Sequence, residues 1–134
     1  MILEFLYRRQ QYRITKVTIG KVKLNAIVAD TFTKKVIGLM FRRSLPKNTC
    51  MLFPFGNAAN QGIWMRNMEF PIDILWLDGR KRVSGMKKGA QPGRGFFDFK
   101  TYYPERPSKY IVEFQSGFLS RNKVTPATRV IFPT

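Results

Sequence analysis

The sequence predicts one α+β, β-rich domain, in which mostly antiparallel sheets close a compact barrel- or clam-like core accompanied by two short helices. Three observations predict this fold. The 134 residues suit a single domain of ordinary size. Hydrophobic residues make up 44% of the chain, and twelve of its residues are Phe, which is ample apolar surface for a core. Short alternating or wholly apolar runs, separated by Gly, Pro or Asp-Gly, recur along the chain as strands do.

The first thirty residues are expected to supply strands. Residues 1–9 are interpreted as a first strand or a docked terminus, with an interfacial role at a membrane as the alternative, and residues 1–12 as an N-terminal extension. Residues 13–29 alternate apolar and polar side chains on either side of Gly20. That pattern predicts two antiparallel strands joined by a turn.

A short helix and a buried strand are predicted next. Thr31 or Thr33 can cap the helix, which carries its apolar side chains on one face and is expected to end near Arg42. The wholly apolar run Cys50-Met-Leu-Phe53 predicts a buried strand. We expect that strand to stop at Pro54, because proline has no backbone N–H to donate.

The most strongly apolar strand follows Pro71. A strand over residues 62–66 is predicted before it, after a glycine-containing turn. Both faces of residues 72–77 are largely apolar, so this strand is expected to be central. Asp78-Gly79 is a hairpin signal that returns the chain beside it over residues 80–88.

The last third of the chain combines a long loop with the final strands. Residues 89–107 are rich in Gly and Pro and predict a loop of a length that is often functional. Residues 108–114 and 129–132 predict strands, and Ser116 can cap a short helix between them.

Charge is the most unusual feature of the composition. The 24 Lys and Arg against eight Asp and Glu give a formal net charge of +16. Such a field favours polyanions, of which nucleic acid, anionic lipid and acidic polymers are all compatible. A basic surface that only keeps the protein soluble is the alternative.

Two absences limit the chemistry. The chain has no histidine, which excludes Ser-His-Asp and Cys-His machinery, a histidine base and histidine metal ligands. Cys50 is the only cysteine, so no internal disulfide or thiolate zinc cluster can form, and we expect it to pack as a small hydrophobe. Neither a cofactor nor a metal is predicted, and an enzymatic role is not favoured.

The location is predicted to be cytoplasmic. Apolar residues precede Arg8 and Arg9, which is the reverse of the order in a secretory signal. No apolar run approaches the roughly 18 residues that a transmembrane helix needs.

Seven short stretches keep one order along the chain: Val28-Ala-Asp-Thr31, Gly38-Leu-Met-Phe-Arg42, Met51-Leu-Phe53, Trp64-Met-Arg-Asn67, Phe70-Pro-Ile-Asp-Ile74, Tyr110-Ile-Val-Glu113 and Gly117-Phe118. Together they resemble the family called domain of unknown function 192, or UPF0127, over about residues 21–132. Trp-Met-Arg-Asn followed by Pro-Ile-Asp is the most specific part of the resemblance.

The resemblance implies a compact β-rich domain with short helices, and it brings no agreed substrate, cofactor or catalytic residue. The sequence departs from the family pattern twice. Cys50 stands where a glycine commonly precedes Met-Leu-Phe, and Pro126-Ala-Thr128 replaces a usual Gly-Asp turn.

Asp73 is the most informative single residue, because a carboxylate on an apolar strand must be hydrogen-bonded, paired with a cation or protonated. In one interpretation backbone groups and the Asn67 amide donate to it and tie the turn before the strand. In the other, Trp64, Arg66, Asn67 and Asp73 form a ligand pocket. A third hypothesis pairs Asp73 with Glu113 for glycoside hydrolysis, although nothing in their spacing supports it.

Cations and aromatic rings interleave in residues 87–106. The cations are Lys87, Lys88, Arg94, Lys100 and Arg106, and the rings are Phe96, Phe97, Phe99, Tyr102 and Tyr103. Surfaces that bind single-stranded nucleic acid have this composition, with cations on phosphates and rings stacked on bases. Alternatively, the rings close over the core and anchor the loop.

The leading hypothesis is a non-enzymatic binding module that engages a polyanion such as RNA or DNA without sequence specificity. A small-ligand or carbohydrate-binding domain with its pocket at Trp64, Arg66, Asn67 and Asp73 is the alternative. A hydrolase that uses acid residues is the third.

Overall fold

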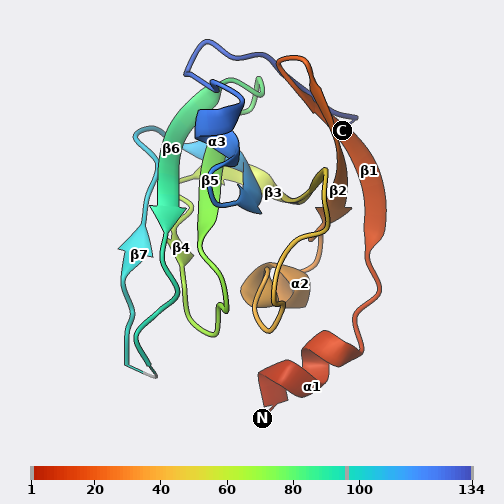
Figure 1. Cartoon of the computed structure of the whole chain (residues 1–134), viewed down its shortest axis with the longest axis vertical. Coiled ribbons are helices and arrows are strands. Elements are labelled where there is room, and N and C mark those ends of the chain that lie inside the picture. The colour runs from red at the N-terminus through yellow and green to blue at the C-terminus, as the bar shows by residue number, and fades with distance from the viewer. Residues whose placement is uncertain (1, 96, 134) are drawn as a thin grey trace.

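The computed structural model describes residues 2–95 and 97–133 and shows the predicted β-rich α+β fold (Figure 1). Its elements follow in the order α1 (Ile2–Arg8), β1 (Arg13–Ile19), β2 (Val22–Val28), α2 (Phe32–Ile37), β3 (Thr49–Ala59), β4 (Ile63–Trp64), β5 (Ile72–Leu77), β6 (Val83–Ala90), β7 (Thr101–Tyr102), β8 (Ser108–Gln115), α3 (Phe118–Arg121) and β9 (Val130–Ile131).

Most strands join one curled sheet in the order β6-β5-β8-β3-β2-β1-β9, while β4 and β7 form a separate ribbon. Neighbouring strands are antiparallel, with β2 and β3 as the parallel exception. A parallel pair needs a crossover connection, and α2 lies within it. The predicted central strand is β5, which lies inside the sheet beside the edge strand β6 and is buried on both faces.

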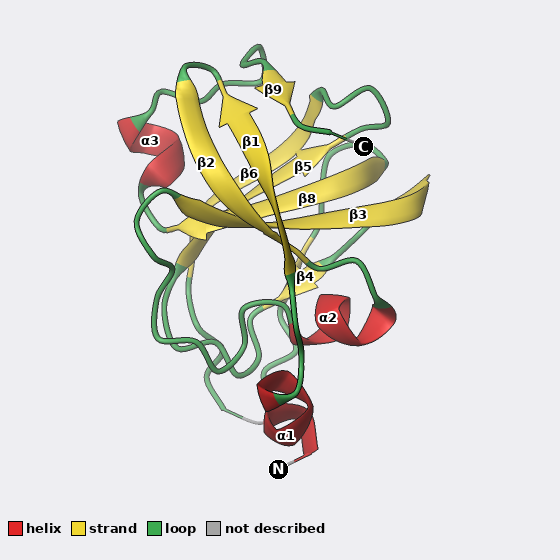
Figure 2. Cartoon of the chain, turned by 90° about the vertical axis from the view of Figure 1, so that its right-hand side faces the viewer, coloured by secondary structure: helices red, strands yellow, loops and turns green. Residues whose placement is uncertain are grey.

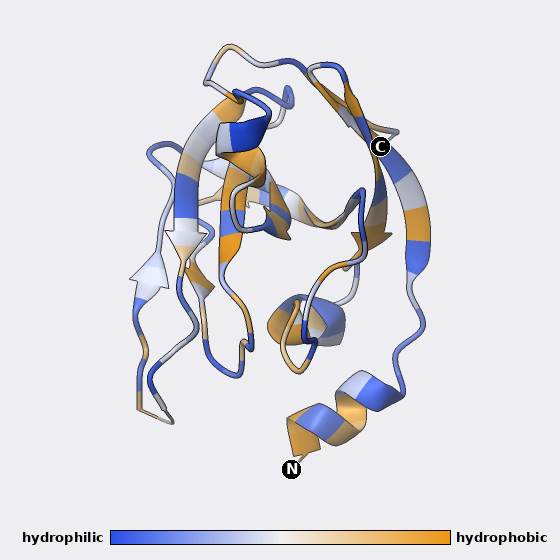
Figure 3. Cartoon of the chain, viewed as in Figure 1, coloured by the Kyte–Doolittle hydropathy of each residue, from blue (hydrophilic) through white to orange (hydrophobic). Residues whose placement is uncertain are grey.

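Side-chain alternation gives each face of the sheet its own apolar cluster. Leu75, Val112 and Phe114 belong to the cluster that packs against Phe118 of α3. Ile72, Ile74 and Ile111 belong to the cluster that packs against Leu39, just after α2. Figure 2 shows α3 and α2 on opposite sides of β3 and β8, and Figure 3 shows β5 as one of the most hydrophobic segments. We call the side of the sheet that packs against α3 the α3 face and the opposite side the α2 face. Each side chain on these strands lies on one of the two.

The N-terminal segment is a helix, so the expectation of a first strand is wrong. Ile2–Arg8 forms α1, within which Arg8 and Glu4 make an i,i+4 ion pair of 3.5 Å. The helix lies beside α2 in Figures 1 and 2, and the Tyr7 and Phe41 rings lie 6.0 Å apart. Leu, Glu and Arg favour a helix when no strand is available to pair with the segment.

Several predicted boundaries also shift. Thr31 caps α2 as predicted, but the helix ends at Ile37, because Gly38 adopts a φ of +51°. Strand β3 continues through Pro54, whereas it was expected to stop there. The pairing of β2 with β3 ends at Leu52. Strand β2 therefore needs no hydrogen bond from position 54, and the missing N–H of Pro54 costs nothing on that side. The predicted strand over residues 62–66 shrinks to Ile63–Trp64.

None of the helices within residues 2–95 and 97–133 has the length and apolar character that a membrane span requires.

Candidate functional site

Asp73 serves the fold. Its carboxylate is 1% exposed and accepts three backbone N–H groups, from Gly89 at 2.8 Å, Gly117 at 3.1 Å and Leu119 at 2.9 Å. It thereby caps α3, whose N-cap is Gly117 and not the expected Ser116. It also holds the β-bulge at which β6 passes β5.

The structure does not bring the four residues of the predicted pocket together. Asn67, expected to donate to Asp73, instead points its amide at the Met40 sulfur, 3.8 Å away. Trp64 and Arg66 do meet, since the Arg66 guanidinium lies 5.0 Å from the centre of the Trp64 ring. Asp73 itself faces α3, and its carboxylate is fully engaged there.

Glu113 lies on the other face of the sheet. Its partners across the strands are Met51 and Ile74, both members of the cluster on the α2 face. Asp73 pairs with Phe114, one residue further along β8, and successive residues of a strand point to opposite faces. Asp73 and Glu113 therefore do not form the paired carboxylates of a glycoside hydrolase.

Glu113, which the sequence suggested only as a partner of Asp73, is distinguished by its own surroundings. It is 3% exposed, and burial raises the pKa of its carboxyl to about 8. Among the described residues no cation or hydrogen-bond donor contacts that carboxyl group. The signal was present in the sequence, because Glu113 stands in an apolar strand just as Asp73 does.

A group of exposed rings lies on one side of the β4-β7 ribbon. Trp64 pairs with Thr101, and the Trp64 and Phe99 ring centres are 6.3 Å apart. Tyr103 lies on the same side, where it packs closely against Gly62. The exposed fractions are 39% for Trp64, 53% for Phe99 and 59% for Tyr103, so these rings do not close over the core. We call Trp64, Arg66, Phe99 and Tyr103 the ring face.

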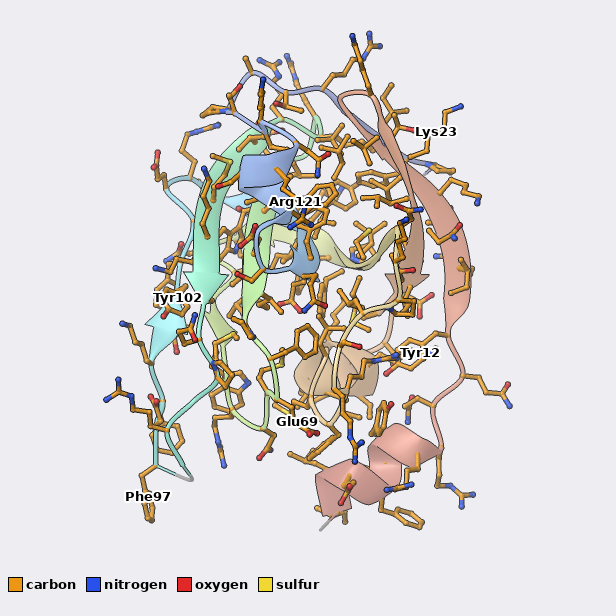
Figure 4. All side chains as sticks on the ribbon, viewed as in Figure 1. Tyr12, Lys23, Glu69, Phe97, Tyr102 and Arg121 are labelled. Atoms are coloured by element: carbon orange, nitrogen blue, oxygen red, sulfur yellow. The ribbon has the colours of Figure 1, made fainter. Side chains whose placement is uncertain are left out.

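A cationic cleft adjoins the ring face on the other side of the ribbon. It has a volume of about 460 Å³, and its lining includes Arg94, Lys100 and Tyr102. The ammonium groups of Lys87 and Lys100 lie 5.0 Å and 5.3 Å from the centre of the Tyr102 ring. Figure 4 shows Tyr102 beside β6 and β7 at the outer edge of the molecule.

Asp98 organises the loop that carries the cleft. Its carboxylate accepts the backbone N–H groups of Arg94 at 2.8 Å and Lys100 at 3.1 Å. These two hydrogen bonds lower the pKa of Asp98. Asp98 is the acidic residue in the described lining of the cleft, and its bonds hold the two cationic residues at fixed positions along the loop.

The remaining candidates of the loop are dispersed. Lys88 is exposed on β6, and Phe97 is 83% exposed and points away from the molecule in Figure 4. Arg106 lies at the far end of β6, where it donates to the Val83 carbonyl at 2.6 Å and pairs with Asp78. Eight residues of strand separate that end from the cleft, so Arg106 is not part of it. Phe96 lies outside the described residues.

Cys50 packs as expected. It is fully buried in the cluster on the α3 face, and burial raises the pKa of its thiol to about 12. The thiol therefore stays protonated and unreactive in the folded chain.

Comparisons with known proteins agree on one family. The family model of DUF192, described as uncharacterized ACR, COG1430, matches residues 15–132. A UPF0127 protein of Pyrococcus furiosus is 33% identical over 122 residues, which cover 85% of this chain and 92% of that protein. A UPF0127 protein of Thermococcus kodakarensis is 33% identical over 100 residues, which cover 75% of this chain. The match spans only 57% of the length of that Thermococcus relative.

Two solved structures share the fold. A protein of Sinorhizobium meliloti, described as a candidate transcription regulator, superposes with a TM-score of 0.83 at 23% identity, over 92% of this chain and 97% of its own. A protein of unknown function from Novosphingobium aromaticivorans gives a TM-score of 0.76 at 26% identity, over 90% of this chain and 85% of its own. With the family model matched from residue 15 to residue 132, the chain belongs to the DUF192 family.

Proposed function

We propose that the chain is a non-enzymatic module that binds single-stranded RNA or DNA without sequence specificity. The observation that carries the proposal is the exposure of the rings of the ring face, with a cationic cleft on the opposite side of the same ribbon. Bases stack on exposed rings whatever their sequence, and Lys and Arg contact the phosphates between them. We place the bases on Trp64, Phe99 and Tyr103, and the phosphates near Arg94 and Lys100.

The net charge of +16 strengthens this assignment, because phosphate contacts release counterions from the nucleic acid. The Sinorhizobium neighbour's description as a candidate transcription regulator is compatible with it but belongs to that protein. A cytoplasmic location, where RNA is abundant, is part of the proposal.

Fluorescence anisotropy with labelled oligonucleotides of about 12 nucleotides tests the proposal. Binding at low salt is expected to weaken as salt rises, with a log-log slope of about −0.7 for each phosphate contacted. Replacing Phe99 by Ala removes one stacking ring and is expected to cost about 1–3 kcal/mol of binding free energy.

The matched comparison is between two double variants of equal charge. Arg94→Ala with Lys100→Ala is expected to reduce both the affinity and the salt slope. Lys21→Ala with Lys23→Ala removes the same charge from two exposed positions, one just before β2 and one within it. Lys23 lies on the far side of the molecule from Tyr102 in Figure 4, so this pair is expected to have the smaller effect. Absence of binding at low salt, or equal losses in the two double variants, contradicts the proposal.

A further inference from the structure

Glu113 lines a cavity between α2 and the sheet. The cavity has a volume of about 70 Å³, and its lining includes Phe53 of β3, Trp64 of β4, Ile72 of β5 and Gly38 at the end of α2. Most of the lining side chains are apolar, so Glu113 is the main polar side chain that a ligand in the cavity would contact. Trp64 is among the most exposed lining residues and marks the side that meets solvent.

The size of the cavity limits its occupant. A cavity of about 150 Å³ holds benzene, and a single water needs about 10–15 Å³. The present cavity therefore suits a group smaller than an aromatic ring, such as a carboxamide or several waters, while the rest of a ligand lies outside against Trp64.

Charge limits the occupant further. Because burial raises the pKa of Glu113 to about 8, its carboxyl is mostly neutral at pH 7 and presents one O–H donor beside one carbonyl acceptor. Lys35 of α2 is the other charged residue among the described lining residues, and the Arg66 guanidinium covers the Trp64 ring. β3, β4 and β5 contribute apolar side chains to the lining. These cations and the neutral acid disfavour a cationic occupant.

We propose that this cavity binds the primary carboxamide of a small molecule, whose N–H and carbonyl pair with the two oxygens of Glu113. A carboxamide places a donor and an acceptor side by side, which matches the donor and acceptor of the neutral acid. The site shares only Trp64 and its neighbour Arg66 with the nucleic-acid face, and neither proposal requires the other.

NMR titration of the full chain with three probes of similar size tests the inference: propionamide, propionate and propylammonium. We expect propionamide alone to shift the Trp64 indole N–H and the Gly38 amide, with a millimolar Kd. Its affinity is expected to be about tenfold weaker at pH 9 than at pH 6, because only the neutral acid donates.

Two variants separate a binding role from a structural one. Glu113→Gln keeps a donor and an acceptor, so it is expected to bind propionamide equally at both pH values. Glu113→Leu removes both and is expected to abolish binding while remaining folded, since it replaces an unpaired buried polar group by an apolar one. Undiminished binding to the Leu variant, tighter binding of propylammonium, or no shift with propionamide at any pH overturns the inference.

Discussion

Asp73 and Glu113 lie on neighbouring strands of one sheet, at exposures of 1% and 3%, yet their surroundings are opposite. On the α3 face, three backbone N–H groups donate to Asp73. On the α2 face, no described donor reaches the Glu113 carboxyl, and Glu113 lines a cavity instead. Burial alone therefore does not reveal what a carboxylate does. The number of hydrogen-bond donors near each carboxyl makes the difference. Asp73, with three, is structural, whereas Glu113, with none among the described residues, is available to a ligand.

Of the substitutions that test this comparison, Asp73→Ala is expected to reduce stability most. The change leaves three N–H groups without their acceptor and releases both the β6 bulge and α3, so we expect a loss of about 3–5 kcal/mol in the free energy of unfolding. Urea denaturation at pH 7 measures it. Asp73→Asn keeps one carbonyl acceptor and is expected to lose less. A loss below about 1 kcal/mol for the Ala variant contradicts the structural role.

The pH dependence of stability isolates Glu113. Its pKa is about 8 in the folded chain and 4.5 ordinarily, so between these values the unfolded chain releases a proton that the folded chain retains. The free energy of unfolding is therefore expected to fall as the pH rises from about 4.5 to about 8, with a slope of at most about 1.4 kcal/mol per pH unit. Outside this range Glu113 adds no pH dependence.

Denaturation of the wild type and Glu113→Gln at pH 5, 6, 7 and 8 measures this slope. The variant has no carboxyl to titrate and is expected to lose most of the decline. Because the chain has no histidine, imidazole does not mask the result. If the free energy of unfolding falls equally with pH in both proteins, Glu113 has an ordinary pKa, and the contrast with Asp73 is wrong.

The sequence could predict the strands but not these two environments. Apolar runs and local turns mark strands such as Ile72–Leu77, because the signals lie within a few residues. The donors to Asp73 come from Gly117 and Leu119, which are 44 and 46 residues away. Nothing in the local pattern tells which acid receives them.

The same reason explains the error at Pro54. Proline ends a strand that has partners on both sides, and the local sequence does not show that β2 leaves β3 after Leu52. The exposure of Trp64, Phe99 and Tyr103 likewise depends on where the ribbon lies relative to the sheet, so the sequence left two interpretations of those rings open.

Helices α2 and α3 give the prediction with the smallest expected effect. The N-terminus of α2 is capped by a residue next to it in the sequence, whereas that of α3 is capped by a residue far away in the sequence. Thr31 accepts the N–H of Lys34, three residues on, at an exposed position, whereas α3 depends on Asp73. Thr31→Ala is expected to cost about 0.5–1 kcal/mol, the low end of the range for N-caps, and Thr31→Ser to cost less. Urea denaturation of both variants beside Asp73→Ala gives the contrast. Equal losses for Thr31→Ala and Asp73→Ala mean that the distant carboxylate is an ordinary cap, whereas a severalfold larger loss for Asp73 means that it also holds the bulge against the sheet.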